Sequence, residues 1–271
     1  MLTATPMRYL RIIRTFWRNS LIREMTFRWH FIINAAAELG WIVLMLIFID
    51  VIYANTGDVR GWTQAQYLFL TGTHLLITSI FEAFFWGNCW RVSELVRTGN
   101  LDFVLVRPAN AQFLLSFERL DYSSFANVPA ALGICGYALV SGGRSVTLQQ
   151  GLVFVVLIFA GVMILYALLF TFAVTSVWLI RQTGIEGLWF YTVSLARYPA
   201  EIYRRFLGGA LFFVLVFVVP VLLVSNLPAN VVMRTFEPGM VAHVLAAGLL
   251  LLAASTVVMR LALRWYRSAS S

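Results

Sequence analysis

The chain has 271 residues, of which 61% are hydrophobic and 12% charged, and its mean hydropathy is +0.82. Soluble domains carry about 25% charged residues, so this composition excludes an ordinary soluble domain and predicts an all-α integral membrane protein. The net charge is +8, every basic residue is arginine, and lysine is absent. Because a P-loop needs a lysine to reach the β- and γ-phosphates, the chain has no ordinary ATP-hydrolysing site of its own.

The first expected element is an amphipathic helix at residues 8–21, within a cytoplasmic segment predicted at 1–28. At 100° per residue its apolar side chains share an arc of about 140°: Tyr9, Ile12, Ile13, Phe16 and Trp17. Its basic side chains share about 120° on the other side: Arg8, Arg11, Arg14 and Arg18. We expect this helix to lie in the membrane surface, where its arginines meet anionic lipid. The segment lacks the pattern of a signal peptide, so the first span is expected to stay in the mature protein.

Six later segments are long and apolar enough to cross a bilayer, which requires roughly 20 residues as a helix. We predict one permease domain at residues 29–265, followed by a cytoplasmic tail at 266–271. The predicted spans are residues 31–53, 66–86, 113–140, 151–180, 206–223 and 241–263.

The arginines predict the orientation of these spans. Sixteen of them fall on the side that holds both termini, three fall on the opposite side, and Arg119 lies inside the third span. Under the positive-inside rule this bias predicts that both termini are cytoplasmic. Residues 187–196 are too few to span, so we expect an interfacial segment there and a cytoplasmic location for 194–205.

The predicted cytoplasmic loop after the second span, residues 89–112, contains a compact polar elbow. Thr98-Gly99-Asn100 favours a tight turn, and Arg107-Pro108 requires an extended residue before the next helix. The intervening LDFVLV is apolar. Either the bilayer surface or another protein is expected to cover it, unless it folds back on its own helices.

Three stretches carry a resemblance that extends over nearly the whole chain. LVRTGNLDFVLVRP at residues 95–108 resembles the signature that follows the second span in one family of ABC-2-type transporter permeases. SLARYPAEIYRR at 194–205 resembles an R-Y-P element of the same family, and VVPVLLVSNLPAN at 218–230 resembles the exit of its fifth span.

The resemblance implies a transport subunit that is not itself an enzyme and that works with two ATPase subunits, which bind ATP and Mg²⁺. It also implies a second permease subunit, either identical or related, and a re-entrant segment at residues 224–239 that Pro220 and Pro228 can break. The surface helix and the loop after the second span are implied to contact the ATPase. The coupling residues carried over are Arg97, Gly99, Asn100, Asp102, Arg107 and Pro108, together with Arg11 and Arg14.

Charged groups inside the spans point to a cargo pathway, because each costs about 2.5–3.5 kcal/mol at a helix centre. Glu38 and Glu82 have no arginine nearby on their own helices, and Trp41 and Phe85 are candidate aromatic partners for a flat cation. These four residues predict a pathway for a cationic cargo, unless Glu82 simply reaches water near the inner surface and the aromatic residues only anchor their helices at the membrane interface. His74 is expected to be a hydrogen-bonded packing residue. Arg119 is expected to pair with Glu118 or Asp121.

Other classes of protein are less well supported. The three histidines are scattered, and neither HExxH nor GxSxG occurs, so no metal or nucleophilic site is expected. Topology accounts for the positive charge, so no nucleic-acid partner is expected. We predict an exporter of an amphipathic or cationic small molecule, in the manner of multidrug efflux, in a bacterial inner membrane. The alternatives are a permease for a lipid or other hydrophobic compound and an ATP-independent channel or carrier; import also stays open.

Overall fold

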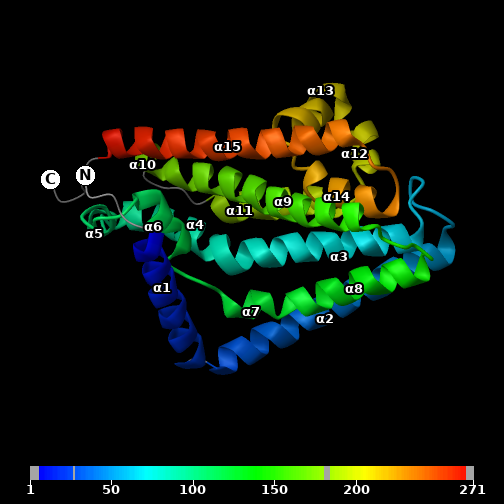
Figure 1. Ribbon diagram of the computed structural model, residues 1–271, viewed down its shortest axis with the longest axis horizontal. Coiled ribbons are helices and arrows are strands. Elements are labelled where there is room, and N and C mark those ends of the chain that lie inside the picture. The colour runs from blue at the N-terminus through cyan, green and yellow to red at the C-terminus, as the bar shows by residue number, and fades with distance from the viewer. Residues whose placement is uncertain (1–5, 27, 180–183, 267–271) are drawn as a thin grey trace.

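The computed structural model describes residues 6–26, 28–179 and 184–266 of the chain. Long helices run side by side along one axis of the molecule (Figure 1). One end of this bundle carries the first helix, α1, and the last turn of α15; we call it the proximal end. The opposite, distal end carries the α2–α3, α8–α9 and α14–α15 connections (Figure 1). The proximal end is the one predicted to face the cytoplasm.

The described residues form helices throughout, with a single isolated β-bridge between Val59 and Trp62. Two of the helical segments, η1 and η2, are π-helical. The elements are α1 Pro6–Thr26, α2 Arg28–Asn55, α3 Gln64–Phe81, η1 Glu82–Trp86, α4 Gly87–Arg97, α5 Asp102–Leu105, α6 Ala111–Phe117, α7 Tyr122–Phe125, α8 Asn127–Ser141, α9 Leu148–Val174, α10 Ser176–Leu179, α11 Ile185–Arg197, α12 Ala200–Phe206, α13 Gly208–Phe213, η2 Val214–Val218, α14 Leu223–Met233 and α15 Pro238–Trp265.

Five helical stretches are long and apolar enough to cross a membrane, and a sixth candidate is the pair Gly208–Val218 and Leu223–Met233, bent by 75°. The five overlap predicted spans one to four and six, which confirms an all-α, multi-pass membrane protein, although the second continues to residue 97, into the predicted loop, and the third begins only at residue 122. They are Ile32–Asn55, Gln64–Arg97, Tyr122–Ser141, Leu148–Leu179 and Pro238–Trp265. The predicted end of the fourth span at residue 180 and nearly all of the predicted tail lie outside the described residues.

Glycines allow the central helices to pack closely. A Cβ added to Gly72 of α3 would lie 2.7 Å from the Cys135 sulfur and 3.0 Å from the Ala131 carbonyl of α8. A Cβ on Gly161 of α9 would lie 3.3 Å from the Val224 carbonyl of α14. Small residues at helix contacts are typical of membrane bundles, where close van der Waals packing replaces the hydrophobic effect between helices.

The path of α11 differs from the sequence prediction. Trp189 stacks on Phe81 and Trp86, with ring centroids 4.8 and 5.3 Å apart, in the proximal half of the bundle. Twelve residues later, Glu201 accepts a 3.1 Å hydrogen bond from the indole of Trp62, which lies just before α3 at the distal end. Helix α11 therefore crosses the bundle antiparallel to α3, and residues 187–196 are not an interfacial segment.

The thirteen residues of α11 rise about 20 Å, and extended backbone at Tyr198 and Pro199 adds about 7 Å, which together approach the thickness of a bilayer core. The helix alone is shorter than the length rule requires, and the extended chain that follows it makes up the difference. Residues 198–205 consequently belong to the distal half rather than to a cytoplasmic loop.

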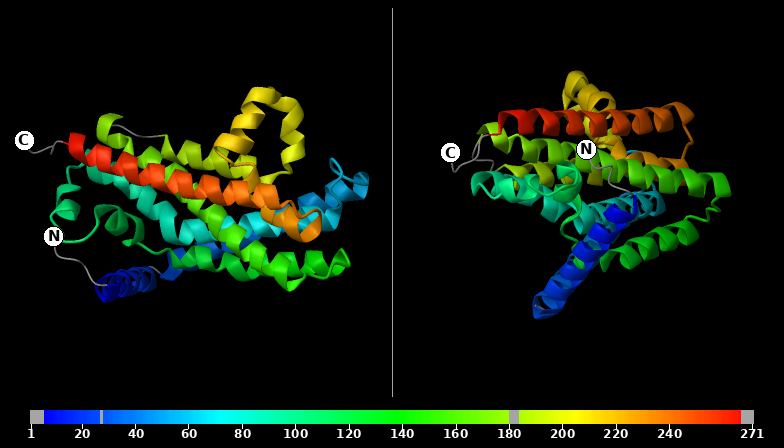
Figure 2. Two further views of the ribbon diagram at one scale, coloured as in Figure 1. Left: turned by 45° about the horizontal axis from the view of Figure 1, so that its top comes forward. Right: turned by 60° about the vertical axis from the view of Figure 1, so that its left-hand side comes forward.

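The predicted fifth span, 206–223, instead belongs to a hairpin. The Asn226 side chain donates to the carbonyls of Tyr198 (3.0 Å) and Leu222 (2.8 Å) and accepts from the Ala200 amide (3.0 Å). Both ends of the segment thus meet at one side chain, and α12, α13 and η2 project from the bundle between them (Figure 2). The predicted break at Pro220 is present, whereas Pro228 lies within α14.

The N-terminal helix is amphipathic as predicted, but protein covers much of its apolar face. Tyr9 packs edge-on against Phe113 at 4.6 Å, and Trp17 lies 5.8 Å from Phe84. Phe16 also packs against the main core cluster. The helical period identified correctly the face that packs on the protein, and these side chains are half-buried there.

The crossing of α11 predicts the accessibility of the hairpin. Arg204→Cys should react with a membrane-impermeant maleimide on intact cells, as should Thr235→Cys in the distal α14–α15 connection. Phe103→Cys at the proximal end should react only after the cells are opened. Native Cys89 and Cys135 are buried and should give little background. Reaction of Arg204→Cys together with Phe103→Cys, rather than with Thr235→Cys, would contradict the assigned crossing.

Candidate functional site

The elbow at the proximal end consists of the C-terminal end of α4, a turn and the short helix α5. Helix α4 ends at Arg97, and Gly99 adopts a φ of +72°, a conformation that glycine reaches without steric cost. The Gly99 amide donates to the Val96 carbonyl at 3.2 Å, and the Leu101 amide donates to the Leu95 carbonyl at 3.1 Å. The predicted Thr98-Gly99-Asn100 turn is therefore present, and it reverses the chain into α5.

The apolar run of the elbow divides between two faces of α5. Leu101 and Val104 are 1% and 2% exposed and belong to the main core cluster. Phe103 and Val106 are 68% and 78% exposed. One face thus anchors the elbow to its own helices, and the other presents two large apolar side chains to the surroundings.

The residues predicted to couple to an ATPase surround these apolar side chains. Arg97, Asn100, Arg107 and Pro108 are exposed. Asp102 instead faces the end of α15, where burial and this nearby carboxylate raise the pKa of the Tyr266 phenol.

The surface helix meets the elbow at a groove of about 390 Å³, which α1 and residues 107–109 line. Arg11, Arg107 and Pro108 are among its lining residues. Arg14 is exposed but does not line the groove. The structure thus brings the two predicted contact regions together at one proximal surface.

Between α6 and α7 the third span is interrupted at residues 118–121; we call these residues and Tyr122, the first residue of α7, the junction. Helix α1, η1 and α4 all contribute hydrogen-bond acceptors to it. Its consecutive amides donate over 2.8–3.1 Å: Arg119 to Asn88 Oδ1, Leu120 to Ser20 Oγ, Asp121 to the Ala83 carbonyl and Tyr122 to Glu24 Oε1.

The charges at the junction are arranged differently from the prediction. Glu118 pairs with Arg91 of α4, not with Arg119. The carboxylate of Asp121 caps α7 by accepting from the Ser123 amide at 2.9 Å. Arg119 forms no ion pair with either acid in the described part of the chain. Asp121 therefore caps α7 and Glu118 pairs with Arg91, so neither acid forms the expected pair with Arg119.

A cavity of about 360 Å³ lies among α2, α3, η1, α8 and α11. Three of the four predicted pathway residues line it: Glu38 and Trp41 from α2 and Glu82 from η1. The fourth, Phe85, packs elsewhere, 4.8 Å from the Tyr166 ring, and lines a different pocket. The sequence-derived pair of glutamates therefore shares one space, although Phe85 does not belong to it.

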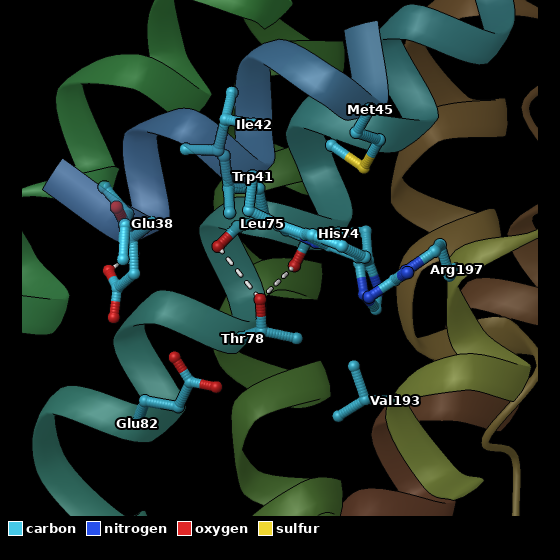
Figure 3. Close-up of a pocket in the computed structure, with 12 residues that line it drawn as sticks. Glu38, Trp41, Ile42, Met45, His74, Leu75, Thr78, Glu82, Val193 and Arg197 are labelled. Atoms are coloured by element: carbon cyan, nitrogen blue, oxygen red, sulfur yellow. Dashed lines mark hydrogen bonds between the residues drawn. The ribbon is translucent and has the colours of Figure 1, made fainter. Parts of the chain in front are cut away.

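The polar groups of this cavity lie on opposite sides. Glu38 and Glu82 lie on one side, and Arg197 reaches in from α11 on the other, next to His74 (Figure 3). Thr78 lies between them and donates its hydroxyl to the His74 carbonyl at 3.0 Å. Trp41 and Met45 add apolar surface. The cavity can thus contact both polar and apolar parts of a small molecule.

Sequence reasoning missed several members of this site. Arg197 was expected in a cytoplasmic loop, because α11 was judged too short to cross. Asn127 was not singled out, yet it lines the cavity and donates to the Glu38 carboxylate. His74 has the predicted hydrogen bond, with Nδ1 3.1 Å from Ser225 Oγ, and it also contributes to the wall. The intramembrane position of these polar residues could have identified them, had the crossing been known.

Comparison with known proteins identifies the family of this fold. A sequence profile described as "ABC-2 family transporter protein" matches residues 39–270. The chain belongs to the ABC-2 transporter family. Neither a curated protein nor a solved structure matches the chain. ABC-2 permeases are membrane subunits of transporters and associate with ABC ATPases, so the elbow and the cavity belong to a transport protein.

The junction predicts that Ser20 anchors α1. Ser20→Ala should leave the buried Leu120 amide without its acceptor and reduce stability by about 1–3 kcal/mol. Asn19→Ala, an exposed change on the same helix, is the control and should have little effect. Thermal unfolding of the detergent-purified variants measures the difference. Equal melting temperatures for Ser20→Ala and Asn19→Ala would contradict the anchoring role.

The raised pKa of Glu24 predicts that the stability contributed by the contact between α1 and the junction depends on pH. Burial raises the pKa of the Glu24 carboxyl above its ordinary value of 4.5, and nearby Asp121 adds to the rise, although the bond from the Tyr122 amide opposes it. The stabilisation from the protonated form is complete below 4.5 and is lost as pH rises through the raised pKa. The melting temperature of the native chain should therefore fall relative to that of Glu24→Gln over this range. Parallel pH profiles for the two proteins would contradict this prediction.

Proposed function

We propose that this ABC-2 chain converts ATP hydrolysis on two separate ATPase subunits into the export of an amphipathic or cationic small molecule. The observation that carries the proposal is the elbow, where exposed Phe103 and Val106 stand on a short helix whose opposite face is buried in the permease core. An exposed apolar surface that is rigidly anchored in this way can transmit force, because a push on it moves the helices to which it is anchored. Without a lysine for a P-loop, the chain needs a partner to hydrolyse ATP.

A continuous helical path connects the elbow with the cavity. The stretch Gln64–Arg97 is a single 34-residue span that ends at the elbow, and its π-helical turn begins at Glu82. Such turns frequently occur at functional sites. Closure of the ATPase partners would displace α4, flex the helix at η1 and shift Glu82 relative to Glu38. The junction would carry the same motion to α1, which shares hydrogen bonds with it.

The cavity favours a cationic cargo over the lipid alternative. Two carboxylates line it beside Trp41, whereas an acyl chain would gain little from them. A hydrophobic compound remains the second candidate, because several apolar side chains also line the cavity. A second permease subunit, a bacterial inner membrane and an outward direction of transport complete the proposal.

The elbow provides the test. The affinity-tagged chain, purified in mild detergent from its own host, should carry ATP hydrolysis that belongs to a separate polypeptide. Phe103→Asp should reduce the co-purified hydrolysis at least tenfold, because an aromatic hot-spot residue contributes about 2 kcal/mol or more to an interface. Phe236→Asp, which changes an exposed phenylalanine in the distal α14–α15 connection, is the matched control and should retain the activity.

Equal losses in Phe103→Asp and Phe236→Asp would show that the effect is not specific to the elbow. Transport of solute into vesicles by the purified chain alone would contradict dependence on an ATPase and would support the ATP-independent alternative.

A further inference from the structure

The carboxylate side of the cavity has more hydrogen-bond acceptors than donors. Asn127 is 5% exposed, and its amide nitrogen donates to the Glu38 carboxylate. Its carbonyl oxygen is buried and has no hydrogen-bond partner among the described residues. The half-buried side chain of Glu82 forms no hydrogen bond or ion pair within the ranges that the structure describes. A buried acceptor such as the Asn127 oxygen is costly unless a donor reaches it, so this side of the cavity fits a ligand with N–H groups.

The opposite side has an unpaired donor. Arg197 Nε is buried without a hydrogen-bond partner in the described part of the chain. Neighbouring His74 already engages Ser225 through Nδ1 and does not serve as the acceptor for this guanidinium nitrogen. A ligand atom that accepts a hydrogen bond, such as an ether, hydroxyl or carbonyl oxygen, would satisfy Arg197.

The charges of the wall determine the net charge of a well-matched ligand. With both carboxyls, Glu38 and Glu82, ionised against the one guanidinium of Arg197, the lining carries a net charge of −1, the state that a bound cation favours. An uncompensated charge within a membrane protein is expensive, and a ligand with one positive charge would neutralise the site. An anion would make the imbalance larger.

The geometry points to a cargo-binding site for a small amphipathic amine with a single positive charge and a hydrogen-bond-accepting oxygen. Its protonated amine contacts Glu38, Glu82 and the carbonyl oxygen of Asn127. Its oxygen accepts from Arg197, and its apolar part lies against Trp41 and Met45. The volume of about 360 Å³ falls within the range of ligand sites. The assignment of this ligand as cargo rests on the proposed transport function.

Binding of three related probes to the purified chain tests this site. Propranolol carries a protonated amine, two oxygens and a naphthalene ring. Its oxygen-free analogue has methylene groups in place of the ether and hydroxyl, and naphthylacetate is an anion with the same ring. Equilibrium dialysis against the permease in detergent should give the order propranolol, then the analogue, with naphthylacetate showing no saturable binding.

Variants assign the roles of individual side chains. Glu38→Gln and Glu82→Gln should each weaken propranolol binding by about tenfold or more, as expected for the loss of a charge-assisted contact. Glu186→Gln, an exposed glutamate at the start of α11 and outside the cavity, is the control and should bind as the native chain does. Arg197→Met should remove the preference for propranolol over its oxygen-free analogue. Melting temperature and size-exclusion profile confirm that each variant is folded, and a conservative Arg197→Lys change replaces Arg197→Met if the latter is not.

Two results would overturn the site: native affinity in both glutamine variants, or saturable binding of naphthylacetate equal to that of propranolol. Because the assay uses the permease alone, its result is independent of the ATPase test. Absence of propranolol binding alongside co-purified ATP hydrolysis would refute the amine site and leave the proposed function intact. Binding of propranolol without any co-purified ATPase would refute the proposed function and support the site.

Discussion

The backbone of the junction, residues 118–122, imposes the constraint on which the proximal half of the molecule depends. A chain that leaves helical geometry inside a membrane bundle exposes amides that lipid cannot satisfy. Here four consecutive amides find acceptors on α1, η1 and α4. Docking of α1 is therefore not a separate event from the folding of the third span, because each leaves buried polar groups unsatisfied without the other. The same contacts fix where α8 begins and hence where Asn127 meets Glu38.

The π-helical turn η1 contacts both the junction and the cavity. The Ala83 carbonyl accepts from the Asp121 amide of the junction at 2.9 Å. The neighbouring residue, Glu82, faces the cavity. A hydrogen bond thus joins the junction to the residue next to a cavity-lining side chain, one peptide unit away. Ser20 and Glu24 of α1 accept hydrogen bonds from the Leu120 and Tyr122 amides, so the surface helix contacts the same junction.

Most of the fold follows from local sequence signals, and its differences from prediction have identifiable physical causes. Long apolar runs predict the spans because a bilayer requires a minimum helical length, and the Thr98-Gly99-Asn100 turn follows from the backbone freedom of Gly99. The period of α1 identifies which face is buried, but no helical wheel can tell whether lipid or protein covers it. That answer lies in Tyr9 and its long-range contact with Phe113.

The candidate site was only partly predictable for the same reason. Glu38 and Glu82 were identifiable because an ionisable group inside a span is unusual. Arg197 was not, since its helix is shorter than a span and its arginine matched the pattern of a cytoplasmic loop. Asn127 carries no charge and has significance only through its contact with Glu38. Sequence therefore indicates where charge enters the membrane, whereas tertiary structure determines which charges face one another.

The short length of α11 also explains why a cationic side chain lines the cavity. Because α11 ends at Arg197 within the bundle, its last turn places a cation near the negative end of the helix dipole, a favourable arrangement. The extended backbone that follows is tolerated because Asn226 satisfies the Tyr198 carbonyl and the Ala200 amide. A full-length apolar helix would cross more simply, but it would bring no guanidinium to face Glu38 and Glu82. Interrupted helices commonly border the substrate sites of transporters, where irregular backbone is stable only beside protein or a cavity. The broken crossing thus provides the polar contact that distinguishes this cavity from the apolar packing around it.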